Sequence, residues 1–290
     1  MYPTLQEVCE QALALPCSPA LLPRLNAVLA NPEATVEDME AVLRIDTVLA
    51  SSTIRLANSA FFSGSKAPVE SVGEAVMRLG LREVHRLASM AVAGRWMTQE
   101  VTGYGWEPGD FFRVSLVTAL AAETLAEQTE RVEPAQAYTA GLVSEIGKLA
   151  IAHACGPAFV EFGRRQRESN CPWSQAERDV LGYNYATVGG ELLRQWKFPE
   201  TFAVIAENNP PGADVPEAHR PLAAHVHAAK YLACSMGPGQ GIDGFLFALN
   251  SDLLAEQNLT AELLERCMVP VFERTEKILR EKVTTGAIKL

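Results

Sequence analysis

The chain has 290 residues, 48% of them hydrophobic and 21% charged, a balance typical of a globular protein with one large or two smaller domains. A formal net charge of −10 argues against a protein that binds nucleic acid or an anionic membrane through clustered basic residues. No basic segment followed by an apolar run opens the chain, and no apolar stretch approaches the roughly 18 residues that a membrane-spanning helix needs.

Apolar residues recur at three- and four-residue spacing along almost the whole chain, whereas sustained alternation with a period of two is missing. Four segments also carry a helix-start signal, in which a hydroxyl residue precedes a carboxylate by three positions. These pairs are Thr4 with Glu7, Thr35 with Asp38, Ser71 with Glu74, and Ser174 with Glu177. The sequence therefore predicts an all-α fold.

The predicted helices form two groups separated by a glycine- and proline-containing segment at 98–110. The first group is predicted near 4–15, 18–30, 36–44, 47–59, 71–79 and 82–97. The second is predicted near 110–130, 134–154, 157–168, 174–181, 185–196, 199–207, 218–234 and 260–283. We expect a two-lobed multi-helical bundle, with residues 1–105 as an N-terminal lobe and 106–290 as a second lobe with a C-terminal helical extension.

Three segments of the sequence carry a shared pattern. They read IRLANSAFF at 54–62, SVGEAVMRLGLR at 71–82 and GLVSEIGK at 141–148. In their order and spacing, over roughly residues 15–210, they resemble the HDOD family, a bacterial signalling module related to the HD metal-dependent phosphohydrolases. The resemblance implies that the second lobe is a degenerate HD-like helical bundle.

The third segment differs from the HD enzymes where those enzymes bind their metal. The resemblance places Ser144 and Glu145 at the position of the His-Asp ligand pair. A serine hydroxyl is a poor ligand, and a divalent ion needs several converging N, O or S donors. The resemblance therefore implies no catalytic residue, no metal and no cofactor. It assigns the remnant of the HD pocket to Val114, Ser144, Glu145, Lys148, Tyr185, Asn208 and Asn209.

Tyr185 and Val114 stand where relatives often have histidine, and Asn208 and Asn209 fall where relatives often show paired histidines. We expect the ring of Tyr185 to fill the volume of the lost ligands and its hydroxyl to bond Glu145 or Asn208. In that case the pocket is closed and structural. If a pocket stays open, a small ligand could still be sensed there.

The first two segments hold the residues that the resemblance marks as a family signature, namely Arg55, Asn58, Ser59, Phe61, Phe62 and Gly80. On a helix Arg55 and Asn58 share one face, so that the guanidinium and the amide can bind backbone groups at a turn. We interpret the signature as structural. A contact site for a partner is the alternative.

Other candidate sites are weaker. The six cysteines show no Cys-x-x-Cys spacing, which favours free thiols in a reducing cytoplasm over a zinc or redox motif. His225 and His227 would point about 200 degrees apart on a helix and could not share a metal ion. We therefore expect a cytoplasmic chain that binds neither metal nor cofactor.

Three functions remain open for the chain. The first is a non-catalytic scaffold that contacts a protein partner, which the resemblance links to two-component or cyclic-dinucleotide signalling. The second is a sensor of a nucleotide or small molecule that uses the remnant HD pocket. The third, a residual metal-dependent phosphohydrolase, needs ligands that the sequence does not supply. Neither nucleic acid nor a membrane is an expected partner.

Overall fold

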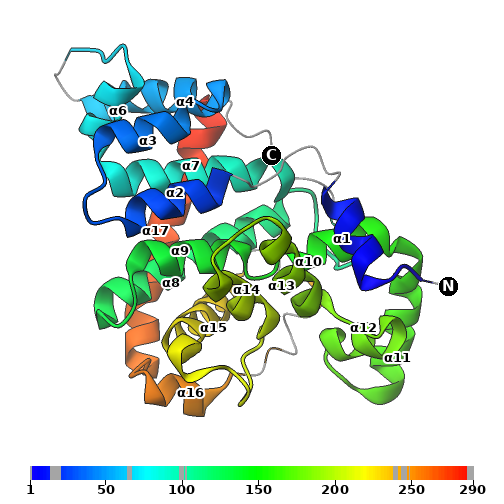
Figure 1. Cartoon of the computed structure of the whole chain (residues 1–290). Helices are drawn as coiled ribbons and strands as arrows, with labels where there is room; N and C mark the ends of the chain where they lie inside the picture. The colour runs from blue at the N-terminus through cyan, green and yellow to red at the C-terminus, as the bar shows by residue number, and fades with distance from the viewer. Residues whose placement is uncertain are drawn as a thin grey trace.

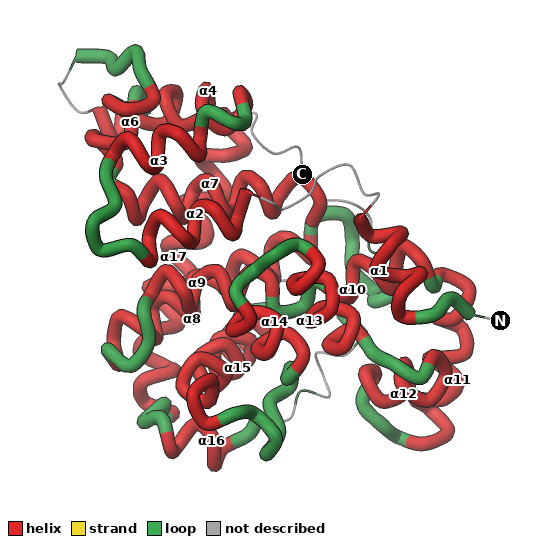
Figure 2. Tube along the Cα trace, viewed as in Figure 1, coloured by secondary structure: helices red, strands yellow, loops and turns green. Residues whose placement is uncertain are grey.

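The computed structural model describes residues 2–13, 21–63, 67–97, 101, 103–237, 241–242, 247 and 249–285. All regular secondary structure in these ranges is helical, which confirms the all-α prediction (Figures 1 and 2). None of the described helices is both long enough and apolar enough to cross a membrane.

The first lobe lies at the upper left of Figure 1. Its helices are α2 (Leu21–Ala30), α3 (Val36–Leu43), α4 (Thr47–Ala57), α5 (Ala60–Ser63), α6 (Val72–Leu79) and α7 (Leu81–Met97). Gly80, with a φ of 84°, separates α6 from α7 and permits the turn between them, because a side chain would strain that backbone conformation. The lobe joins the rest of the protein through contacts of α2 and α7 with α9, and of α7 with α8.

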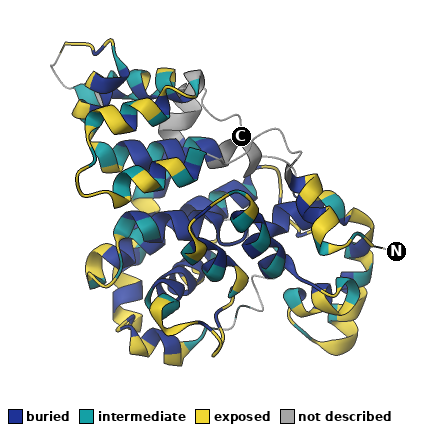
Figure 3. Cartoon of the chain, in the orientation of Figure 1, coloured by how far each residue is buried: buried dark blue, intermediate teal, exposed yellow. Residues whose placement is uncertain are grey.

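The second lobe is built around a central helix. Its elements are α8 (Asp110–Thr129), α9 (Pro134–Val143), α10 (Gly147–Ala154), η1 (Gly156–Ala158), α11 (Phe159–Ser169), α12 (Trp173–Leu181), α13 (Tyr185–Gln195), α14 (Glu200–Glu207), η2 (Glu217–His219), α15 (Arg220–Ser235), α16 (Ser251–Glu256) and α17 (Ala261–Thr285). Helix α8 is buried over most of its length and packs against α9, α15 and α17 (Figure 3). The core of the lobe therefore surrounds α8.

The first helix of the chain, α1 (Leu5–Leu13), lies away from α2 to α7. It packs against α10 and α13 of the second lobe (Figure 1). Its buried side chains include Val8, Cys9 and Ala12, which supply the apolar contact. The range 1–105 thus contains a helix that contributes to the second lobe.

Three of the four predicted helix-start signals form at the helix ends. Thr35 and Asp38 make a reciprocal capping box, Thr4 and Glu7 bond each other in the same way, and the hydroxyl of Ser71 accepts from the N–H of Glu74. The fourth prediction was wrong. Helix α12 begins at Trp173 after Pro172, so Ser174 lies inside it and Glu177 points into the core.

The helix predicted at 134–154 is broken in two. Helix α9 ends at Val143 and α10 begins at Gly147, with one turn of irregular backbone between them. A Cβ at Gly147 would lie 1.9 Å from the carbonyl oxygen of Tyr185. The chain therefore needs glycine there so that α10 and α13 can approach. The short helices α5 and α16 were not predicted, because four and six residues show no clear period.

Candidate functional site

The segment that resembles the HD metal motif lies at this break between α9 and α10. The hydroxyl of Ser144 donates to the carbonyl of Gly141, 3.0 Å away, and so caps its own helix. The side-chain amide of Asn209 donates to the carbonyl of Ser144 across 3.3 Å. Both side chains are buried and bind backbone carbonyl groups. The ionisable residue at the break is Glu145, and its side chain is buried as well.

Two ammonium groups bind the carboxylate of Glu145. The Nζ of Lys148, one turn later on α10, lies 2.5 Å from Oε1. The Nζ of Lys230, from α15, binds the same oxygen. All three side chains are at least nine-tenths buried, and Lys148 has no exposed surface. We call Lys148, Glu145 and Lys230 the Lys–Glu–Lys cluster.

The two lysines keep the carboxylate ionised. Burial by itself raises the pKa of Glu145, because a charge is poorly solvated in the interior. The charges and hydrogen bonds of Lys148 and Lys230 more than reverse this effect and lower the pKa from 4.5 to about 2. The cluster thus places one carboxylate between two cationic groups.

Aromatic rings surround the ammonium of Lys148. Its Nζ lies 4.7 Å from the ring centre of Tyr185, 5.0 Å from that of Trp106 and 5.7 Å from that of Tyr104. The Nζ of Lys230 lies 5.9 Å from the ring centre of Tyr185 and 5.6 Å from that of Phe247. The negative faces of these rings stabilise a cation, so they offset the charge that Glu145 leaves unbalanced.

We call residues 103–109, between α7 and α8, the connector. Hydrogen bonds of Tyr104 hold it against the second lobe. The hydroxyl of Tyr104 donates to Glu177 Oε1 across 2.6 Å, and the backbone N–H of Tyr185 donates to Oε2 across 2.8 Å. The N–H of Ile242 donates to the carbonyl of Tyr104, 2.9 Å away. The buried Glu177 therefore joins the connector to α13, next to the Lys–Glu–Lys cluster.

The polar side chains of Tyr185 and Asn208 bind backbone carbonyls rather than other side chains. The hydroxyl of Tyr185 donates to the carbonyl of Asn209 at 2.9 Å, and not to Glu145 or Asn208 as expected. Asn208 turns back to donate to Val204 at the end of α14. Val114 is buried on α8.

The donor groups of the site do not suit a divalent metal ion. Within the described ranges, no group of three or more His, Cys, Asp or Glu residues is placed to hold one. His225 bonds Pro221 and Thr129, whereas His227 accepts from the N–H of Asn250. Among the residues assigned to the remnant pocket, Glu145 alone is acidic. The two groups that bind its carboxylate are both ammonium groups.

The sequence reasoning missed Lys230, Tyr104, Trp106 and Phe247. Lys230 carried a signal, because it follows Ala228 and Ala229 on a helix whose buried residues are mostly apolar. A lysine on such a face needs a buried acidic partner. The three aromatic residues lie in irregular segments, where no periodicity indicates which way a ring points.

The family signature forms a corner of the first lobe. The side-chain amide of Asn58 donates to the carbonyl of Val69, and its oxygen accepts from the N–H of the same residue, each at 2.8 Å. Arg78 donates to the carbonyls of Ala57 and Ala67 at 3.2 and 2.6 Å. These contacts hold Ala67 and Val69 against the end of α4, which supports a structural role for Asn58.

The other signature residues contribute fewer hydrogen bonds to this corner. The guanidinium of Arg55 reaches Ser52 on its own helix at 3.4 Å, so the expected backbone contacts are made by Arg78 instead. The hydroxyl of Ser59 is buried without a hydrogen-bond partner among the described residues. Phe62 is half-buried, and the side chain of Phe61 lies outside the described part of the structure.

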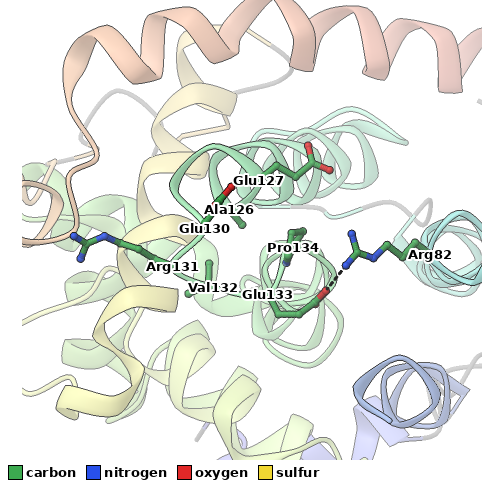
Figure 4. A pocket seen from close by; sticks show the side chains of 8 residues that line it. All are labelled: Arg82, Ala126, Glu127, Glu130, Arg131, Val132, Glu133 and Pro134. Carbon is green, nitrogen blue, oxygen red and sulfur yellow. Dashed lines mark ion pairs between the residues drawn. The ribbon is translucent and has the colours of Figure 1, made fainter. Parts of the chain in front are cut away.

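A surface pocket of about 500 Å³ opens elsewhere, at the turn between α8 and α9 (Figure 4). It is lined by Arg82, Ala126, Glu127, Glu130, Arg131, Val132, Glu133 and Pro134. Arg82 of the first lobe faces Glu133 across it at 3.9 Å. None of these residues belongs to the remnant HD pocket.

Comparison with known proteins places these observations in a family. The HDOD domain model matches residues 15–210. An uncharacterized protein of Treponema pallidum (strain Nichols) is 26% identical over 219 residues, which cover 73% of this chain and 40% of that protein. The chain therefore spans less than half of the length of this relative.

Solved structures share the fold. A candidate signal transduction protein from Marinobacter aquaeolei VT8 has a TM-score of 0.72 at 24% identity, over 99% of this chain and 62% of that one. An HDOD domain protein with unknown function from Geobacter sulfurreducens has a TM-score of 0.66 at 21% identity, over 96% of each chain. Because the family model covers well over half of its length, this chain belongs to the HDOD family.

Proposed function

We propose that this chain is a non-catalytic HDOD-type regulatory scaffold that acts through protein–protein contacts. A signalling-related role is supported by the family and by the name of the Marinobacter structure. Its link to two-component or cyclic-dinucleotide signalling is part of the proposal. The observation that carries the non-catalytic assignment is the Lys–Glu–Lys cluster, which holds the residue that the resemblance assigns to an HD metal ligand.

A metal ion would have to compete with two ammonium groups for one carboxylate. Leaving a buried charge without its partner costs roughly 3–5 kcal/mol. A single carboxylate is also too few donors for a catalytic ion, whose role is to polarise the substrate or to lower the pKa of a bound water. The cluster therefore supports a structural role for Glu145 and disfavours hydrolysis.

A sensor that uses the remnant pocket is less well supported. Lys148 has no exposed surface, and Tyr185 is 3% exposed. To enter, a ligand would have to separate Tyr185 from Asn209 or a lysine from Glu145. These side chains fill the volume that such a ligand would take, which favours the scaffold.

Two experiments test the proposal. In the first, hydrolysis of bis(p-nitrophenyl) phosphate is followed with added Mn²⁺ or Mg²⁺ for the wild type and for Glu145→Gln. We expect both proteins to stay at the buffer rate. Turnover by the wild type that the substitution abolishes in a folded variant would contradict the non-catalytic assignment.

The second experiment tests the contacts. Purified receiver, diguanylate cyclase and cyclic-dinucleotide phosphodiesterase domains from the same organism are titrated against the chain by calorimetry, with cyclic di-GMP titrated separately. The scaffold predicts saturable binding to at least one of these domains. Binding of the nucleotide alone, lost in Lys230→Met, would favour the sensor instead.

A further inference from the structure

The last helix, α17, has two different faces. Its inner face packs on α8 through buried side chains, among them Cys267 and Val271. On the opposite face Val269 is 63% exposed, and Phe272, three residues later, is 54% exposed. Two large apolar side chains one turn apart on an exposed helix face indicate a contact surface.

Carboxylates surround this apolar pair. The positions three, four and seven residues before and after Val269 lie on the same face of the helix as Val269 itself. One of the two positions at a distance of three holds Arg266, and the other holds Phe272. All positions at distances of four and seven hold glutamate, namely Glu262, Glu265, Glu273 and Glu276. The outer face of α17 therefore combines two exposed apolar side chains with four carboxylates and one cation.

Two of these carboxylates lie directly beside the apolar pair. Glu265 precedes Val269 by one turn and Glu273 follows it by one turn. Both are exposed, and neither forms an ion pair with a basic group in the part of the chain that the structure describes. Lys277 lies eight residues from Val269, toward the edge of the face, and already interacts within the chain. The outer face therefore attracts basic groups from outside the chain.

The inner side of α17 is fixed on its own chain. Arg274 donates to the hydroxyl of Thr124 at 2.8 Å and to the carboxylate of Glu123, and it lies 3.7 Å from Glu127. These three partners are residues of α8. Because the helix is already ordered, a partner that binds its outer face does not have to order it, which favours association.

We propose that the outer face of α17 binds a basic amphipathic helix of a partner protein. A complementary partner presents apolar side chains to Val269 and Phe272, and Lys or Arg one and two turns to either side of them. A helix that packs along α17 has this spacing, because its residues repeat with the same period.

Other occupants fit this face less well. A second copy of the chain would bring the glutamates of one face close to those of the other, which is unfavourable. The phosphates of nucleic acid and of anionic lipid headgroups would be repelled for the same reason. The inference concerns α17 alone, so it holds whether or not the remnant pocket is catalytic, and its test and the hydrolysis assay can fail independently.

Fluorescence anisotropy with a labelled synthetic helix tests the docking face. The peptide carries two central Leu residues three positions apart, and Lys four and seven positions to either side of the first Leu. The wild-type chain should bind it saturably, with an affinity that falls several-fold from about 50 to about 300 mM NaCl because salt screens exposed charges. Peptides with Glu in place of every Lys, or Ser in place of both Leu, should bind at least about tenfold more weakly.

Substitutions on α17 show where the peptide binds. Phe272→Ala should weaken binding about tenfold, because it removes the larger apolar contact. Glu265→Lys combined with Glu273→Lys should weaken it as much and should make the chain prefer the Glu peptide over the Lys peptide. Glu33→Lys combined with Glu37→Lys is the control, because it makes the same charge change at two exposed positions of the first lobe and should bind like the wild type. Circular dichroism verifies that every variant is folded.

Two outcomes overturn the proposal. A wild type that binds the Lys peptide no better than the Glu peptide does not have a docking face for a basic helix. Binding that is unchanged by Phe272→Ala and by the double charge reversal on α17 takes place on another surface of the chain.

Discussion

The ammonium of Lys230 binds the carboxylate of Glu145, although the two residues lie 85 positions apart in the chain. This contact joins α15 to the break between α9 and α10. Lys148 binds the same carboxylate, so two ammonium groups hold Glu145. The buried carboxylate is thus balanced by charges that the protein itself supplies.

Removing the charge of Glu145 should destabilise the fold strongly. Glu145→Gln leaves two buried ammonium groups without a carboxylate, and we expect the free energy of unfolding to fall by roughly 3–5 kcal/mol in urea denaturation. Lys230→Met should cost less, because it leaves Lys148 and Glu145 as a balanced pair.

The control for these variants is Glu161→Gln. Glu161 pairs with Arg164 on the exposed surface of α11, where solvent screens the interaction, so no measurable change is expected. Equal stability of Glu145→Gln and the wild type would contradict the role of the cluster.

The buried histidine of the first lobe should make stability depend on pH. Burial lowers the pKa of His85 from 6.5 to about 4. Between these values the unfolded chain binds a proton that the folded chain does not, so stability falls as pH drops from 6.5 to 4. His85→Gln removes the titrating group and should show a smaller fall between pH 7 and pH 4.5 in urea denaturation.

Here the matched control is His153→Gln, which lies at an exposed position and should keep the wild-type pH profile. If His85→Gln loses as much stability as the wild type over this range, another group is responsible for the pH dependence.

The close approach of α10 and α13 predicts that Gly147 tolerates no side chain. In Gly147→Ala the new Cβ would overlap the carbonyl oxygen of Tyr185, at 1.9 Å, and the backbone nitrogen of Gly189, at 2.7 Å. Because the backbones of α10 and α13 must move apart, we expect the free energy of unfolding to fall by several kcal/mol, as in other severe overpacking substitutions. Thermal unfolding measures it.

Gly212→Ala is the comparison, because a Cβ there meets no atom within 4 Å. It should leave the melting temperature unchanged or slightly raised. A Gly147→Ala protein that melts like Gly212→Ala would show that the two helices can separate without cost.

The corner held by Asn58 predicts a smaller effect. Asn58→Ala removes both hydrogen bonds to Val69, so the N–H and carbonyl of Val69 lose these partners. The free energy of unfolding should fall by about 1–3 kcal/mol. Asn58→Asp keeps the acceptor and should retain part of this stability. Urea denaturation of the two variants decides, and equal losses would mean that the hydrogen bond accepted from the N–H of Val69 contributes nothing.

The local features of the fold could be predicted from sequence, and the contacts between distant segments could not. Helix α8 could be predicted from the apolar and small residues of its own segment, and the Thr35 cap is complete within four positions. The break after Val143 depends instead on α13, which needs the space beside Gly147. Intrinsic helix propensity was overridden by this tertiary contact.

In the candidate site, too, a local feature could be predicted from the sequence, whereas contacts between distant segments could not. The interpretation that Ser144 and Glu145 stand in place of a ligand pair rests on the motif alone. The partner that neutralises Glu145 comes from α15, and the hydroxyl of Tyr185 reaches Asn209 only because α13 and the end of α14 meet there. Such pairings are set by the packing of whole helices, so local spacing does not indicate them.

The most direct test is the metal content of the purified protein after incubation with Mn²⁺ or Zn²⁺ and removal of free ion, measured by plasma mass spectrometry. Because two ammonium groups hold the Glu145 carboxylate, we predict far less than one equivalent of either metal, and the same low value for Glu145→Gln. One equivalent of bound metal in the wild type, lost in a folded Glu145→Gln protein, would contradict the account.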